Sequence, residues 1–291
     1  MKKLADPGTT ASAKPALEEA LASATDAPLR RIYFEAGNTL QYIHSFAFAG
    51  YNLDYVDFTG CPNLKMIGEN NSTAEGAFMY CNNLKVGTAL PAAMVTLGAY
   101  TFKNCTALDV ARFPQAIRYI GRSCFENCVG LTTVALYDAQ HDNAAEVNIT
   151  YLANIGANAF AQCTNLCWAA SYLFPYITEI GNSAFNGCSQ LSMFEDEAAY
   201  TRSGQNLQTL GSSAFYNCSN LRLAFVPNNV TQLKANVFGN TSVVLTSISA
   251  NIMGMEAGAF YGVTFNDTIY WTLDAVRLKA GAYNFNENCL N

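Results

Sequence analysis

The residues of this sequence best suited to chemistry are its ten cysteines. Two pairs, Cys124 with Cys128 and Cys163 with Cys167, lie four residues apart, a spacing that a metal ion can bridge. No histidine and no further close pair stands beside them to complete a tetrahedral zinc site. We therefore interpret the cysteines as structural and predict no metal and no cofactor. The redox state of Cys124, Cys167 and Cys289 stays open.

Histidines and clustered carboxylates are the other candidates for acid–base or metal chemistry. The sequence has only two histidines. We interpret His44 as a turn residue, whereas His141 lies in an acidic insert, Asp138 to Asp142, and a second insert carries Glu195 to Glu197. A metal-dependent or enzymatic module would use these inserts, but solvated loops explain them more simply. Since no phosphate loop or nucleophile motif accompanies them, we predict that the protein is not an enzyme.

Composition and charge restrict the classes of partner. Sixteen basic and 22 acidic side chains give a net charge of −6, and no Lys/Arg cluster is present to neutralise phosphates, so we expect no nucleic acid partner. No apolar run is long enough to cross a bilayer, so we expect no membrane insertion. The Met1-Lys-Lys start is not followed by the apolar core of a signal peptide, which leaves an intracellular and an exported location both open.

The elements that must position these residues come from an internal repeat. The stretch Leu210 to Leu221 contains Gly, then Ala-Phe, a Cys three residues after the Phe and a Leu three after the Cys. Its phenylalanine recurs mostly every 22 to 25 residues, a period typical of solenoids. Close copies are Leu97 to Leu108, Ile120 to Leu131, Ile155 to Leu166 and Ile180 to Leu191; the phenylalanines are Phe48, Phe78, Phe102, Phe125, Phe160, Phe185, Phe215, Phe238 and Phe260, with Tyr283 last; the cysteine slot holds Cys61, Cys81, Cys105, Cys128, Cys163, Cys188 and Cys218.

Each repeat predicts one strand and one tight turn. After each Leu, the first, fourth and sixth places are apolar or small, as in Leu131 to Leu136, which predicts a short strand with one face inward. The Ala-Phe-x-x-Cys segment is too short for an ordinary helix and predicts a helical or 3₁₀ turn opposite the strand. Leu17, Leu21 and their neighbours have helical spacing, which predicts a short capping helix within residues 14–24.

These residues resemble the BspA-like, Treponema-type leucine-rich repeat family, both in the Ile-Gly-x-x-Ala-Phe-x-x-Cys-x-x-Leu unit and in the alternative unit Tyr55 to Gly68. The resemblance implies an α/β repeat solenoid: a right-handed coil with one short strand per repeat forming a curved parallel sheet. For bacterial members it also implies a cell-surface or secreted adhesion protein. We predict a mobile head over 1–13, an N-terminal cap over 14–41, repeats over 42–265 and a degenerate C-terminal repeat or cap over 266–291.

The outward face of the predicted strands is our candidate for binding. Third, fifth and seventh places after the Leu point out if the first, fourth and sixth point in. Many of these places hold aromatic residues or Met, which carry binding energy at interfaces. We predict a protein or glycan partner here, with a purely structural spacer as a further alternative, and the oligomeric state stays open. The candidate residues are Tyr55, Met66, Arg112, Tyr137, Trp168, Tyr172, Met193, Leu223 and Phe225.

Overall fold

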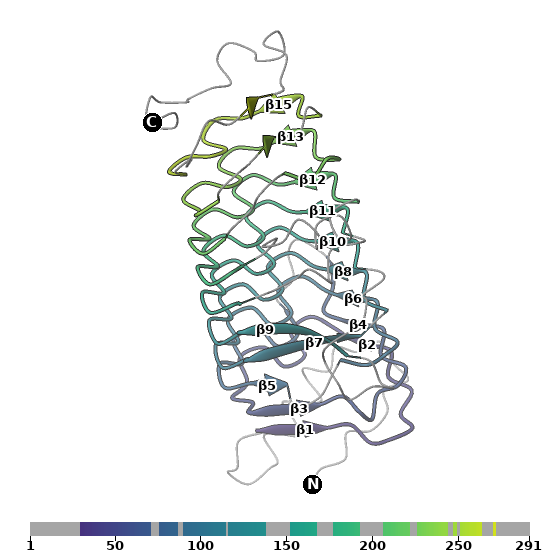
Figure 1. The fold of residues 1–291 in the computed structure, drawn as a ribbon. Helices are drawn as coiled ribbons and strands as arrows, with labels where there is room; N and C mark the ends of the chain where they lie inside the picture. The colour runs from purple at the N-terminus through teal and green to yellow at the C-terminus, as the bar shows by residue number, and fades with distance from the viewer. Residues whose placement is uncertain are drawn as a thin grey trace.

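The computed structural model is a stack of repeats in which each repeat lies against the next from the N-terminal to the C-terminal end (Figure 1). It describes residues 30–70, 76–86, 90–114, 116–137, 152–167, 177–192, 206–221, 226–243, 247–248, 251–263 and 270–271. The capping helix predicted within 14–24, the head over 1–13 and most of the C-terminal segment lie outside these residues. Handedness and curvature of the coil stay predictions.

The strands predicted after the leucines are present in the N-terminal half. β1 (Arg31–Tyr33), β3 (Tyr55–Asp57) and β5 (Lys85–Val86) form a parallel sheet in that order, and β7 (Val110–Pro114) pairs in parallel with β9 (Thr133–Tyr137). The predicted inward register holds in the repeats that contain β3 and β7. Leu53, Val56 and Phe58 are buried at the first, fourth and sixth places of their repeat, and the same places are buried in the repeat that contains β7.

A second ladder of strands, which we did not predict, lies just before the place that holds glycine in most repeats. It corrects our expectation of one strand per repeat. The seven strands are β2 (Tyr42–Ile43), β4 (Met66–Ile67), β6 (Thr96–Leu97), β8 (Tyr119–Ile120), β10 (Asn154–Ile155), β11 (Glu179–Ile180) and β12 (Thr209–Leu210). β13 (Gln232–Leu233) pairs with β15 (Gly254–Met255), and β14 (Ser247–Ile248) with β16 (Tyr270–Trp271). Figure 1 shows the strands of the seven-stranded sheet, from β2 to β12, stacked along one side of the molecule.

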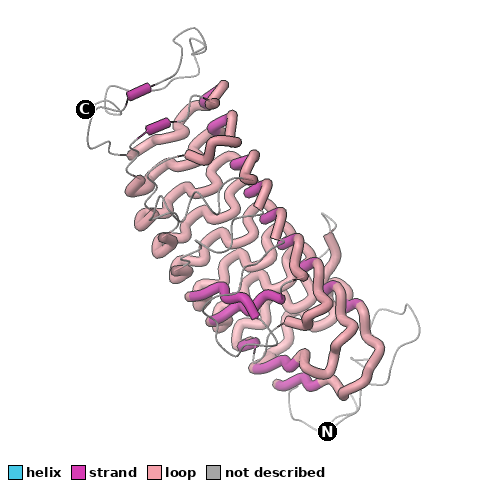
Figure 2. The backbone as a smooth tube through the Cα atoms, turned by 45° about the vertical axis from the view of Figure 1, so that its right-hand side comes forward, coloured by secondary structure: helices cyan, strands magenta, loops and turns pink. Residues whose placement is uncertain are grey.

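The Ala-Phe-x-x-Cys segments are turns, not the helical or 3₁₀ turns that we predicted, and no helix occurs in the residues that the structure describes (Figure 2). In the repeat of Phe185, the backbone N–H groups alternate between two kinds of partner. Ser183, Phe185 and Gly187 donate to carbonyls of the next repeat at 2.8 Å, whereas Ala184 and Asn186 donate three residues back within their own repeat. In a 3₁₀-helix every one of these N–H groups would donate to the carbonyl three residues earlier in the same segment.

Alternate hydrogen bonding requires alternate backbone conformations. Ser183 and Gly187, two residues on either side of Phe185, have φ of 54° and 78°, in the left-handed region. The same two places have positive φ in most other repeats, and asparagine or glycine often fills them. Those two residue types enter that region at least cost. The turns therefore form a third backbone ladder that joins neighbouring repeats.

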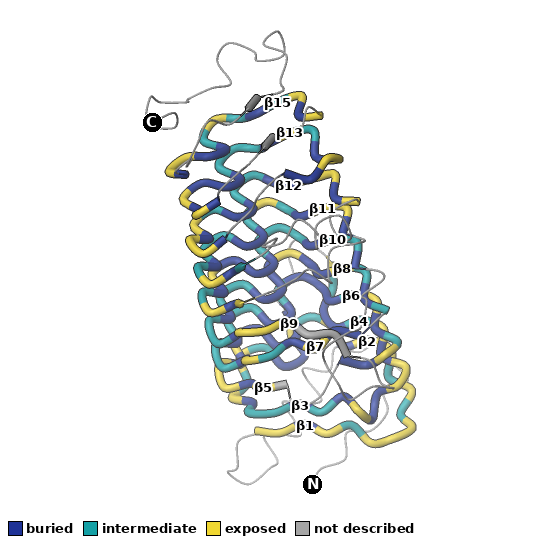
Figure 3. Tube along the Cα trace, viewed as in Figure 1, coloured by how far each residue is buried: buried dark blue, intermediate teal, exposed yellow. Residues whose placement is uncertain are grey.

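The core is one continuous column that passes through every described repeat (Figure 3). Its centre is a stack of phenylalanines running from Phe48 to Phe260, with ring centroids 5.1 to 5.8 Å apart and near-parallel planes. The predicted series of nine phenylalanines is thus confirmed as the core. Tyr283, its predicted last member, lies outside the described residues.

The cysteine slot forms a second buried column beside the rings. Each thiol from Cys81 to Cys218 donates to the carbonyl oxygen of the phenylalanine one repeat earlier, at 3.0 to 3.1 Å. All the described cysteines are free, and Cys167 is the exposed one among them. The interpretation of the slot as structural is supported by this geometry, in which the thiol acts as a small apolar group with one weak donor.

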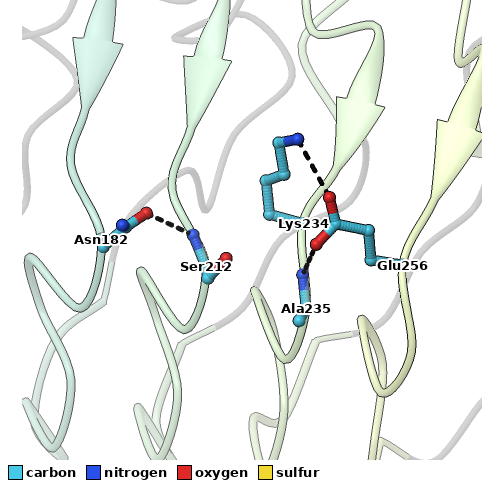
Figure 4. A network of polar contacts seen from close by, with 5 residues as sticks. All are labelled: Asn182, Ser212, Lys234, Ala235 and Glu256. Atoms are coloured by element: carbon cyan, nitrogen blue, oxygen red, sulfur yellow. Dashed lines mark hydrogen bonds and ion pairs between the residues drawn. The ribbon is translucent and has the colours of Figure 1, made fainter.

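The glycine after each short strand allows the repeats to approach one another. A Cβ atom at Gly181 would lie 2.6 Å from the backbone nitrogen of Ala157, and Gly98, Gly121, Gly156 and Gly211 would meet the preceding repeat at similar distances. The seven-stranded sheet ends at β12, and in the next repeat Lys234 fills this place. Beyond this break β13 and β15 pair, and a side-chain contact joins the same two repeats: Lys234 Nζ lies 2.9 Å from Glu256, which also accepts the N–H of Ala235 (Figure 4).

Candidate partner-binding surface

The predicted binding residues do not share one face, because the repeats carry two ladders of strands. Tyr55 lies in β3 and Arg112 in β7, on the strands that follow the leucines. Met66 lies in β4, within the seven-stranded sheet, where it pairs with Tyr42 and Thr96. With Leu64 counted as the first place, Met66 holds the third place, as Tyr55 does from Leu53, so we had predicted the two residues on one face. The structure assigns it to the other sheet, so the predicted stripe is divided in two.

The long-strand face consists of the outward side chains of β1, β3, β5 and β7. Its central row crosses three strands, since Tyr55 pairs with Arg31 on one side and with Lys85 on the other. Alternate residues of a strand point to opposite faces, and Ile32 and Val56 point into the core. Arg31 and Lys85 are exposed, while Tyr55 is half-buried between them. The members of this face are Arg31, Tyr33, Tyr55, Asp57, Lys85, Val110 and Arg112.

Two tyrosines form the aromatic part of this face. The rings of Tyr33 and Tyr55 lie 5.7 Å apart at an angle of 40°, and Tyr33 is 53% exposed. Desolvation raises the pKa of the Tyr55 phenol above its ordinary value, with smaller contributions in the same direction from Asp57 and Tyr33, and Arg31 acts against them. Tyr55 is therefore a neutral hydroxyl at physiological pH, able to donate or accept a hydrogen bond.

Some of the charged side chains around this row have a bonding partner within the described residues, and others form no ion pair there. Arg30 forms a two-point ion pair with Asp54, with its nitrogens 2.7 and 3.0 Å from the carboxylate oxygens. The Asp57 carboxylate accepts the backbone N–H of Thr59 at 2.8 Å. Neither Arg31, Lys85 nor Arg112 has an ion pair within the described part of the chain. The guanidinium and ammonium groups of this face are thus available to a ligand.

The short-strand face consists of the outward residues of β2, β4, β6 and β8. Tyr42 and Tyr119 are 46% and 47% exposed, and Met66 and Thr96 lie half-buried between them. The same place is polar in later repeats, where it holds Asn154, Glu179, Thr209 and Gln232. This face therefore offers an apolar area at its N-terminal end only.

The remaining predicted binding residues are placed in part or not at all. Tyr137 ends β9, and its backbone pairs with Pro114. The other five, Trp168, Tyr172, Met193, Leu223 and Phe225, lie outside the described residues. The structure therefore brings Tyr55 and Arg112 to one face, separates Met66 from them, and does not test the rest.

The groups with possible acid–base chemistry do not converge within the described residues. No set of three His, Cys, Asp or Glu side chains there could hold a metal ion. The ring of His44 lies 2.9 Å from Glu69, and both are exposed. Burial raises the pKa of Cys81 to about 12 and raises the pKa of the other ladder thiols as well, which keeps them protonated and unreactive. His141, Asp138 to Asp142 and Glu195 to Glu197 fall outside this part. No described helix is long and apolar enough to cross a membrane.

Sequence reasoning missed Arg31, Tyr33 and Lys85. The segment Arg31 to Tyr33 alternates polar, apolar, polar, as Tyr55 to Asp57 does, and that match could have identified β1 within the predicted cap. Lys85 was missed for a different reason. With each Leu counted as the first place, Lys85 holds the second place from Leu84, yet it pairs with Tyr55, which holds the third place from Leu53. A shift of one residue between repeats cannot be seen without the pairing.

Comparisons with known proteins agree with this architecture. The family described as BspA type Leucine rich repeat region matches in six copies, over residues 26–140, 71–202 and 139–266. A search of curated proteins gives no match.

Solved structures from several bacteria are similar to parts of this chain. A leucine-rich repeat protein of T. pallidum is 23% identical, with a TM-score of 0.47, over 64% of this chain and 73% of the other. One from Bacteroides ovatus is 21% identical, with a TM-score of 0.46, over 71% of this chain and 52% of the other. A leucine-rich cell surface protein of Faecalibacterium prausnitzii is 16% identical, with a TM-score of 0.30, over 86% and 90%.

Proposed function

Since this chain belongs to the BspA-type leucine-rich repeat family, we propose that it is a non-enzymatic binding protein that presents its repeat surface to a protein or glycan partner at a bacterial cell surface. Leucine-rich repeat proteins commonly act in binding. The repeated residues, the Phe and Cys columns above all, are buried and serve as scaffold. Binding therefore belongs to the residues that differ between repeats and point outward.

The long-strand face is the observation that carries this proposal. It places two adjacent tyrosine rings and two basic side chains without described ion pairs, Arg31 and Lys85, on one sheet around Tyr55. Arg112 adds a third such side chain from β7, in the neighbouring sheet. Tyr and Arg are enriched among the residues that dominate binding energy at interfaces. The predicted residues Tyr137, Trp168, Tyr172, Met193, Leu223 and Phe225 extend the proposed surface toward later repeats, and Met66 contributes to the short-strand face instead.

A pull-down from extracellular matrix and cell-surface material tests the binding role. We expect the wild-type protein to retain a ligand, and the variants Tyr33→Ala and Trp168→Ala/Phe225→Ala to retain less of it. Tyr119→Ala is the matched control, because Tyr119 is about as exposed as Tyr33 but belongs to the short-strand face. Equal recovery of a ligand by all four proteins would remove the long-strand face from consideration, and a wild-type protein that retains no ligand would favour a structural spacer.

Cell-surface location is a separate part of the proposal. Protease treatment of intact cells that express the gene is expected to digest the protein, while a cytoplasmic marker stays whole. Protection of both proteins until the cells are lysed contradicts a surface location and leaves the binding role to be judged by the pull-down.

A further inference from the structure

We propose that the row Arg31, Tyr55 and Lys85, together with Tyr33, binds an anionic glycan: a polysaccharide whose sugars carry carboxylate or sulfate groups. This inference rests on the binding function proposed above and names the chemical class of its partner. It concerns residues that are all in the described part of the chain and that lie on strands paired in a defined register.

The geometry of the row comes from the pairing of β1, β3 and β5. Neighbouring strands lie about 4.8 Å apart, so the Cα atoms of Arg31 and Lys85 are separated by roughly 10 Å with Tyr55 midway. The two cations are thus held on one face, on opposite sides of a tyrosine. Two cations cannot form an ion pair with each other, and no described carboxylate forms an ion pair with either Arg31 or Lys85.

Charge complementarity identifies the ligand as an anion. The chain as a whole carries −6, yet the central row carries two positive charges and no negative one. Two nearby carboxylates limit the site. Asp57 follows in the next row and accepts a backbone hydrogen bond, and Asp54 is neutralised by Arg30. An Arg guanidinium binds a carboxylate or sulfate through two parallel hydrogen bonds, and the Lys85 ammonium supplies a point charge.

The aromatic pair favours a sugar polymer over an acidic polypeptide. Tyr33 exposes half of its surface beside Tyr55, with the two rings tilted by 40°, and an exposed aromatic ring can pack against the C–H face of a pyranose. The backbone of β3 is paired on both sides, so a peptide could add as a further strand only at an edge of this sheet and not beside Tyr55. An exposed face with tyrosine rings and cations suits a polysaccharide, whose hydroxyl and acidic groups can bind these side chains without backbone pairing.

Binding to four polymers tests the ligand class. Immobilised hyaluronan carries carboxylates, heparin carries sulfates as well, dextran is a neutral glycan, and polyglutamate is an anionic polypeptide. We expect the wild-type protein to bind hyaluronan, heparin or both, and dextran and polyglutamate at least ten-fold more weakly. The preference between hyaluronan and heparin separates the carboxylate from the sulfate source. Because surface charges are screened by salt, affinity should fall as the salt concentration rises.

Paired variants locate the site. Arg31→Gln/Lys85→Gln should reduce glycan affinity at least ten-fold and flatten its salt dependence, whereas Tyr33→Ala should reduce affinity several-fold and keep the salt dependence. The control Lys65→Gln/Arg122→Gln also removes one lysine and one arginine charge, but from exposed residues outside the long-strand face. It should leave affinity unchanged. Thermal melting of each variant shows whether the fold is intact.

The proposal is overturned if the wild-type protein binds none of the glycans, if polyglutamate binds as tightly as the acidic glycans, or if both double variants lose affinity equally. The last result would indicate an effect of net charge alone. If the protein binds none of the four polymers but still retains a matrix or cell-surface ligand that the Tyr33→Ala variant loses, the glycan inference is refuted and the proposed binding function stands.

Discussion

The thiol sulfur of Cys163 lies 3.0 Å from the backbone carbonyl oxygen of Phe125, one repeat earlier in the stack. That carbonyl also accepts the N–H of Cys128 within its own repeat, so the thiol supplies a second hydrogen bond to the same oxygen. The slot is small, dry and faces a carbonyl. Cysteine fits it because the residue is small and apolar yet carries a weak donor.

The buried thiols should be protected from alkylation. With iodoacetamide at pH 8, mass spectrometry of the native protein is expected to show rapid modification of Cys167 and slow modification of the cysteines from Cys61 to Cys218 in the core slot. The reason is that reaction requires an accessible thiolate, and the ladder thiols are buried with raised pKa values. Denatured protein is the control and should react at all positions. Rapid native labelling of Cys128 would contradict the buried column.

Stability should fall in alkaline solution. Burial raises the folded-state pKa of these thiols above the unfolded value of about 8.5, to about 12 for Cys81 and further for the more deeply buried thiols such as Cys105. The stabilisation they contribute is therefore complete below pH 8.5 and is lost as the pH rises toward the folded-state value, at about 1.4 kcal/mol per pH unit for each thiol. Urea unfolding between pH 7 and 10.5 measures the slope. Cys105→Ala should make it shallower by one thiol, and an unchanged slope argues against thiol titration as the cause.

Removal of a ring from the middle of the phenylalanine stack should cost about 3–5 kcal/mol, the usual range for a buried Phe→Ala change. Phe185 is the test residue, because it stacks between Phe160 and Phe215 with centroids 5.3 and 5.5 Å away. The measurement is the free energy of unfolding in urea, with exposed Phe46→Ala as a comparison outside the stack. An unchanged denaturation midpoint for Phe185→Ala would refute the stack.

A methyl group in the glycine column should separate neighbouring repeats. In Gly181→Ala the new Cβ would lie 2.6 Å from the nitrogen of Ala157, and since backbone atoms cannot move aside, we expect a loss of at least about 1–3 kcal/mol. Gly37→Asn is the control: the site is exposed, nothing lies within 4 Å, and asparagine tolerates its positive φ. The two melting temperatures should differ by several degrees. Similar values would mean that the repeats are not in backbone contact at Gly181.

A substitution at Asn158 distinguishes the observed turn from a helical one. Asn158 has a φ of 56°, so Asn158→Gly should be close to neutral, and Asn158→Val should lose about 1–2 kcal/mol because a branched side chain is strained there. In a helical turn the order would reverse, since glycine is the poorer helix former. Thermal unfolding of both variants decides between these outcomes.

The sequence predicted the repeat, its period and the core, because a residue that is buried in every repeat must recur at a fixed spacing. Phe48 to Phe260, the cysteine slot and the inward places counted from Leu53 and Leu108 follow from that rule, and the structure confirms them. The candidate surface was less predictable. Tyr55 and Arg112 were placed correctly on strands after the leucines, whereas Arg31 and Tyr33 fell in a segment assigned to the cap.

Tertiary structure decided the features that depend on which group each backbone N–H or C=O bonds to: the short strands, the turns and the alignment of the outward residues. A strand of two residues, such as Met66–Ile67, has no periodicity of its own and exists because neighbouring repeats accept its hydrogen bonds. The turns around Phe185 avoid a helix for the same reason, since alternate N–H groups bond to the next repeat. The spacing of side chains along one repeat thus determined the core. The contacts between repeats determined which outward residues share a face, including the row of Arg31, Tyr55 and Lys85.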